Sequence, residues 1–119
     1  MKKYFIYIIF FTFGLSFAQE KETKRILTQQ GEIIKFEEYH DNGMLSQTGY
    51  FLDGKNHGIW MSYNSEGIKL SKGVYDKGKK TDRWFFWNKG ILIEVDYKDN
   101  IVQNATKWDK AESLASKDD

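Results

Sequence analysis

Residues 58–79, with the sequence GIWMSYNSEGIKLSKGVYDKGK, decide the fold. They contain two runs rich in aromatic, β-branched and long apolar residues, and each run ends at a short corner that holds a glycine. Such runs separated by glycine corners are typical of β-hairpins, because glycine tolerates the left-handed backbone of a tight turn. The corners lie at residues 64–67 and 77–78. This stretch therefore predicts strand, turn, strand, turn.

The same pattern returns along the chain at an interval of about 24 residues, as in a repeat protein. The third copy is irregular, because Gly90 comes 23 residues after Gly67 and Asn100 takes the place of Gly78. Asparagine is the usual substitute for glycine where the backbone needs a positive φ. Four aromatic residues share one register, namely Phe36, Trp60, Trp84 and Trp108, and three share a second, namely Tyr39, Tyr63 and Trp87.

The repeats predict an all-β fold, a single antiparallel β-meander of about seven strands, because short links force neighbouring strands to be antiparallel. The repeat domain is expected over residues 32–108. The absence of proline suits a continuous sheet. Strands are expected at residues 33–39, 44–51, 59–63, 68–75, 83–87, 91–97 and 101–108, with turn glycines Gly43, Gly54, Gly67, Gly78 and Gly90.

The first aromatic register predicts a structural ladder of Phe36, Trp60, Trp84 and Trp108 along one face, since a single hairpin cannot bury its aromatic face alone. Trp60 and Tyr63 are three residues apart, so a regular strand places them on opposite faces. One sheet cannot bury both faces, so either it curls over itself or an aromatic face stays exposed. The candidate ligand surface on that exposed face comprises Tyr39, Tyr63, Tyr75, Trp87 and Tyr97.

The first eighteen residues have the layout of a cleavable secretory signal peptide. Lys2 and Lys3 precede an apolar run at residues 4–15, and small residues then allow a cut after Ala18. The run is shorter than the roughly 20 residues that span a bilayer; the alternative is an uncleaved N-terminal anchor. We expect a periplasmic or secreted protein with no stable membrane span after cleavage. A flexible leader is predicted at residues 19–31 and a charged C-terminal tail at residues 109–119.

Composition excludes several classes of function. Without Lys2 and Lys3 the chain has 16 basic and 17 acidic residues, so nothing basic is left to attract nucleic acid. Cysteine is absent, and the two histidines, His40 and His57, make a weak case for a metal. No cofactor is predicted.

The spacing of Gly58, Trp60 and Tyr63, followed by paired glycine corners, resembles the MORN-variant repeat. The resemblance covers about residues 36–108 and is greatest to small exported proteins of Bacteroidetes-like bacteria, some labelled antitoxin-like. It implies an elongated antiparallel sheet. Unit three departs from the pattern, with Asp82 in the place of Gly58 and Asn100 in that of Gly78.

Some short relatives carry a nicotinate-nucleotide adenylyltransferase label, which the residues do not support. That chemistry needs a parallel α/β sheet and a glycine-rich, histidine-bearing phosphate loop. The carboxylate pairs Glu37–Glu38 and Glu94/Asp96 are interpreted as solvent-facing acids, and residues 104–106 match a glycosylation acceptor only by chance.

The sequence therefore predicts an exported, non-catalytic module that binds a protein partner through its sheet. The alternative is a carbohydrate or cell-wall binding module that uses exposed aromatic residues, and a small enzyme ranks last. The expected sheet edges, at residues 33–39 and 101–108, offer unpaired backbone groups for self-association.

Overall fold

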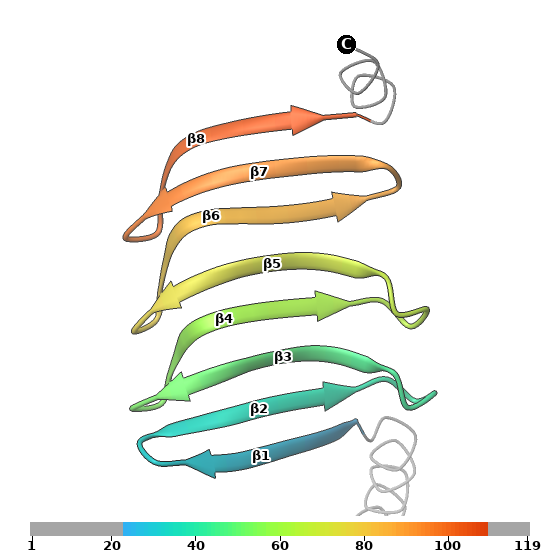
Figure 1. The fold of residues 1–119 in the computed structure, drawn as a ribbon, viewed down its shortest axis with the longest axis vertical. Coiled ribbons are helices and arrows are strands. Elements are labelled where there is room, and N and C mark those ends of the chain that lie inside the picture. The colour runs from blue at the N-terminus through green and yellow to red at the C-terminus, as the bar shows by residue number, and fades with distance from the viewer. Residues whose placement is uncertain (1–22, 110–119) are drawn as a thin grey trace, which may run out of the picture.

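The computed structural model describes residues 23–109, which form eight β-strands in one sheet (Figure 1). The predicted signal peptide at residues 1–18 lies outside the described residues, as does nearly all of the predicted tail. Among residues 23–109, no helix has the length and apolar character needed to cross a bilayer. The strands are β1 (Lys24–Gln30), β2 (Ile33–Tyr39), β3 (Leu45–Leu52), β4 (Lys55–Tyr63), β5 (Lys69–Asp76), β6 (Lys79–Asn88), β7 (Ile91–Lys98) and β8 (Ile101–Trp108).

The strands follow one another across the sheet in chain order, and every neighbouring pair is antiparallel. The predicted all-β meander is therefore confirmed. Figure 1 shows the consequence of this order, an open ladder in which β1 and β8 lie at opposite ends. Each strand makes most of its contacts with the strands before and after it.

The predicted flexible leader at residues 19–31 is wrong for its second half, because residues 24–30 form β1. This strand pairs with β2 from Lys24 opposite Tyr39 to Gln30 opposite Ile33, through a turn at Gly31. The sequence KRILTQQ contains no aromatic residue and is exposed along its whole length, so it lacks the alternation that marks a half-buried strand. As a result β2 lies inside the sheet and is not the edge that we expected.

Two glycines provide seats for the two buried indoles. A Cβ atom added at Gly49 would lie 2.0 Å from the Trp60 ring, and one added at Gly73 would lie 1.9 Å from the Trp84 ring. Each indole thus rests on the bare backbone of the preceding strand. Trp60 and Trp84 are 6% and 5% exposed and, with Val95, are the buried apolar side chains of residues 23–109. We call the side of the sheet that carries them the tryptophan face.

Tyr75 separates the two indoles on this face. Its ring meets Trp60 edge-on at 6.1 Å between centroids and Trp84 edge-on at 5.0 Å. Phe36 extends the series, because it stacks on Trp60 at 5.7 Å. The predicted ladder therefore exists for Phe36, Trp60 and Trp84, but a tyrosine bridges the indoles, which we had expected to touch one another.

Trp108 does not belong to the ladder, contrary to the prediction. The pairing sets Trp84 opposite Val95, and Val95 opposite Ala105, so Ala105 occupies the place of Trp84 in the third repeat. Two differences shorten the third repeat. The turn after β6 consists of residues 89–90 alone, whereas residues 64–68 link β4 to β5, and this brings Trp84 two residues closer to its partner than Trp60 is. The bulge between β7 and β8 also holds one residue fewer than the bulge between β5 and β6, and this single residue changes the face. A fixed interval of 24 residues consequently aligns Trp108 with the wrong face.

The two departures of the third repeat preserve the backbone. Asn100 has a φ of 70° where Gly78 has 90°, and Asp82 has 61° where Gly58 has 72°. The turns are also tied to their neighbours, since the amide of Gly78 donates to Asn56 and the amide of Asn100 donates to Lys80. The expected substitution of asparagine at a positive φ is thereby confirmed.

Candidate functional site

The face opposite the tryptophan face carries a row of four aromatic side chains at the ends of alternate strands. Trp87 and Trp108 lie opposite the same residue, Leu92 of β7, so they share a face and a register. The Tyr39 hydroxyl donates to the Glu37 carboxylate two residues back on the same face, at 2.8 Å. The row, which we call the aromatic row, comprises Tyr39 of β2, Tyr63 of β4, Trp87 of β6 and Trp108 of β8.

Lysines from the neighbouring strands β1 and β5 lie over two rings of the aromatic row. Lys24 Nζ is 5.8 Å from the Tyr39 ring centroid, and Lys69 Nζ is 5.8 Å from the Trp87 ring centroid. At exposed sites such contacts contribute about 0.5–1 kcal/mol. Phe85 also stacks beside Trp87 at 5.9 Å, with 16° between the ring planes. The faces of Tyr39 and Trp87 are thus partly covered.

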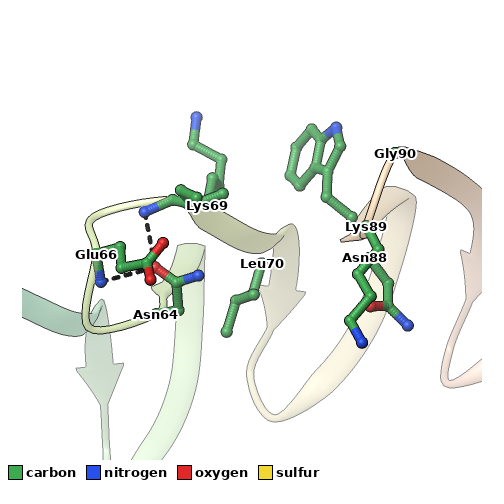
Figure 2. A pocket seen from close by; sticks show the side chains of 9 residues that line it. Asn64, Glu66, Lys69, Leu70, Asn88, Lys89 and Gly90 are labelled. Atoms are coloured by element: carbon green, nitrogen blue, oxygen red, sulfur yellow. Dashed lines mark hydrogen bonds between the residues drawn. The ribbon is translucent and has the colours of Figure 1, made fainter. Parts of the chain in front are cut away.

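A groove of about 670 Å³ lies beside Trp87, between the turn after β4 and the turn after β6. Figure 2 shows Asn64 and Glu66 on one side of it, Asn88 and Lys89 on the other, and Leu70 between them. We call it the Trp87 groove. It is lined by Asn64, Glu66, Ile68, Lys69, Leu70, Trp87, Asn88, Lys89 and Gly90.

One wall of the groove is a turn braced by its own side chain. Asn64 Oδ1 accepts hydrogen bonds from the amides of Glu66 and Ile68, at 2.9 and 3.0 Å (Figure 2). These bonds hold Ile68 with its side chain 55% exposed. The previous turn supports this one, because Asn42 Nδ2 donates to the Ser65 carbonyl at 2.7 Å. Hydrogen bonds of the chain itself therefore hold this wall in shape.

The five residues of the predicted ligand surface are divided between the two faces. Tyr39, Tyr63 and Trp87 lie in the aromatic row. Tyr75 and Tyr97 lie on the tryptophan face, where both meet the Trp84 ring edge-on. The structure therefore brings three of the five together. The sequence did not reveal the Trp87 groove, because its walls come from turns whose relative position depends on strand pairing.

Arg83 gathers the acids that sequence reasoning left without a partner. Its Nε donates to Asp96 at 2.8 Å, and its Nη1 lies 3.3 Å from Glu94. The hydrogen bond from Arg83 holds the pKa of the Asp96 carboxyl below its ordinary value of 3.8. Cross-strand pairing of Arg83 with Asp96 sets up this cluster. Arg83 thus offsets part of the negative charge of Glu94 and Asp96, and the cluster keeps a net charge of −1.

Asp96→Asn should weaken the dependence of the protein's stability on pH at low pH. Because the folded pKa of Asp96 lies below the ordinary 3.8, the unfolded chain binds its proton first. The contribution of the Arg83 pair is therefore complete above that ordinary pKa, and it is lost as the pH falls through the lower folded pKa. Thermal midpoints measured from pH 7 to pH 2 should fall less steeply in the variant below about pH 4.

The control for this measurement is Asp76→Asn, an exposed carboxylate of β5. It should follow the wild-type curve. Parallel curves for wild type and Asp96→Asn would contradict the assigned role of the Arg83 pair.

The two histidines act as links between turns. His40 Nε2 lies 2.9 Å from the Tyr63 carbonyl, and His57 Nδ1 accepts from the amide of Lys77 at 3.2 Å. Within the described part of the chain, no three metal-ligating side chains of His, Cys, Asp or Glu gather.

Comparison of the sequence with protein-family models gave no matching family, and comparison with curated proteins gave no matching relative.

Proposed function

We propose that this chain is an exported, non-catalytic repeat protein that binds a partner protein through the face of its aromatic row. The observation that carries the proposal is the Trp87 groove, where Ile68 and Leu70 are 55% and 40% exposed beside an aromatic ring. Exposed apolar side chains that adjoin a groove are typical of protein-binding surfaces. Asn64, Asn88, Lys69 and Glu66 supply the polar rim.

The geometry of the rings favours a protein partner over a sugar. A sugar ring stacks on an open aromatic face, whereas Lys69 lies over the ring of Trp87 and Lys24 over that of Tyr39. The apolar side chain of a partner needs only the groove between Leu70 and the ring edge. Carbohydrate binding is the second candidate because Trp108, at the end of the row on β8, is 40% exposed.

We further propose that the repeat is a MORN variant. We also propose that residues 1–18 direct export from the cytoplasm and are cleaved off after Ala18. The spacing of Gly58, Trp60 and Tyr63 supports the first statement, and the lysines and apolar run of residues 2–15 support the second. Mass spectrometry of the exported chain should give Gln19 as its first residue. A mature protein that begins at Met1 would contradict cleavage.

Leu70→Asp should abolish capture of the partner and leave the fold intact, since Leu70 is exposed and its side chain borders the groove. The chain, tagged at its C-terminus, is used to retrieve envelope proteins, which are compared by quantitative mass spectrometry. Loss of one buried apolar contact with a new charge in its place should reduce retrieval at least about tenfold. Circular dichroism checks the fold of each variant.

The matched control is Ile101→Asp, which adds the same charge at an exposed apolar residue at the far ends of the strands. It should retrieve the partner as the wild type does. Equal losses in both variants, or in neither, would contradict binding at the Trp87 groove. Quenching of Trp108 fluorescence by a glycan, absent in Trp108→Phe, would instead favour the carbohydrate function.

A further inference from the structure

The two ends of the sheet are complementary in strand direction. Because every neighbouring pair is antiparallel and the number of strands is even, β8 runs opposite to β1 (Figure 1). A second copy placed by simple translation would therefore set its β1 beside β8 in an antiparallel pair. That pairing continues the meander without turning either copy over.

The repeat also fixes which residues would meet. As shown above, Ala105 occupies the place of Trp84. Leu27 of β1 occupies the place of Val95 of β7, because both stand three residues before the last residue of their strands. Trp84 pairs with Val95 within the sheet. The next pair in the series is therefore Ala105 with Leu27 of a second copy. In this register Trp108 faces Lys24, just as Trp87 faces Leu92.

We propose that copies of this protein associate head to tail, with β8 of one copy pairing with β1 of the next. This inference does not depend on the proposed partner binding. Both edge strands lack proline, and both present exposed apolar side chains, Leu27 on β1 and Ile101 and Val102 on β8. Natural sheets protect such edges with charges, bulges or cover, because a bare edge is a template for pairing.

The aromatic row supplies a second argument for the translated arrangement. Lysines lie over Tyr39 and Trp87, and the lysine over Tyr39 comes from β1, the strand that would lie beside Trp108 of the preceding copy. The residues paired with the row on β1, β3, β5 and β7 are Lys24, Leu45, Lys69 and Leu92. Head-to-tail pairing places Lys24 of the next copy after Leu92, and it therefore continues this alternation of lysine and leucine across the junction. A two-fold pairing of β8 with β8 would place the rows of the two copies at opposite ends of the strands.

One pair in the register is unfavourable and makes the proposal testable. Lys107 would face Arg25 of the next copy, because these two residues take the places that Phe86 and Ile93 hold in the pairing of β6 with β7. Arg25 also pairs with Glu38 of its own copy, since its Nε lies 2.7 Å from that carboxylate. Lys107→Glu converts the repulsion into an attraction. It should raise the association constant roughly three- to tenfold, as expected for an exposed cross-strand charge pair.

The first experiment is sedimentation of the exported full chain at concentrations up to about 1 mM. A head-to-tail contact does not close, so the mean mass should rise past the dimer without a plateau. Added salt should strengthen association of the wild type and weaken that of Lys107→Glu. Lys98→Glu, the same charge change in β7, should behave as wild type. A monomer at every concentration, or a plateau at the dimer, would overturn the proposal.

The second experiment tests the register with single cysteines, for which the chain has no background of its own. Thr106 should face Ile26 of the next copy, because Phe85 faces Glu94 within the sheet. Mixed Thr106→Cys and Ile26→Cys proteins should form the heterodisulfide on oxidation, since opposed Cα atoms about 4.5–5.5 Å apart are within reach. Leu27→Cys, on the other face, should not link. Preferred homodisulfides, or a link at Leu27, would overturn the register.

Discussion

Gly73→Ala is expected to lower the free energy of unfolding by about 3 kcal/mol, the upper end of the range for overpacking. The added methyl would lie 1.9–2.3 Å from three atoms of the Trp84 ring. The ring cannot retreat easily, because its Nε1 donates to the Val74 carbonyl at 3.1 Å and Tyr75 meets it edge-on. Urea denaturation followed by far-ultraviolet circular dichroism measures the loss.

The control for this variant is Gly43→Ala, which places its methyl in open space but at a φ of +86°. It should lose only about 1–2 kcal/mol, from backbone strain. A double-mutant cycle isolates the contact, because Gly73→Ala made in Trp84→Ala has no ring to meet and should cost little more. A Gly73→Ala protein as stable as wild type would contradict the glycine seat.

Trp84→Ala is expected to cost about 3–5 kcal/mol, as large-to-small substitution of a buried aromatic does. Trp84 is 5% exposed, and its ring is met by those of Tyr75, Phe86 and Tyr97. Since domains of this size are stable by about 5–15 kcal/mol, the loss is a large part of the total. The variant should still fold but melt at a much lower temperature.

Trp108→Ala is the matched control, because it removes the same side chain from the same sequence register. Trp108 is 40% exposed and lies on the opposite face at an edge strand. Its loss should change stability by less than about 1 kcal/mol. Equal thermal midpoints for Trp84→Ala and wild type would show that the indole is not structural.

The fold could be predicted from the sequence because its signals are local. Glycine corners and runs of aromatic residues mark each hairpin, and short links leave no choice but an antiparallel meander. The strand β1 was not predicted, because an exposed edge strand is defined by its pairing and needs no alternation of apolar and polar residues. Trp108 lies on the other face for a related reason, since the smaller bulge between β7 and β8 shifts the register by one residue without altering the composition.

The candidate site was less predictable because it depends on contacts between turns that are far apart in sequence. The second aromatic register pointed to Tyr39, Tyr63 and Trp87, and these do share a face. Nothing in the sequence indicated that Lys69 would lie over Trp87, or that Arg83 would reach Asp96. The first contact depends on the register of β5 against β6, which a bulge displaces. The second depends on the direct pairing of Arg83 with Asp96 across β6 and β7.

The matching seats at Gly49 and Gly73 make the length of this protein an adjustable property. Excision of residues 55–78 would join Gly54 to Lys79 and set the Trp84 indole on Gly49, in the same geometry that it now has on Gly73. Duplication of the same segment would add one more identical repeat to the sheet. Slippage during gene copying would therefore lengthen or shorten the molecule in whole repeats. After excision, Phe51 would take the place of Tyr75 beside the Trp84 ring, as it now stands beside Trp60.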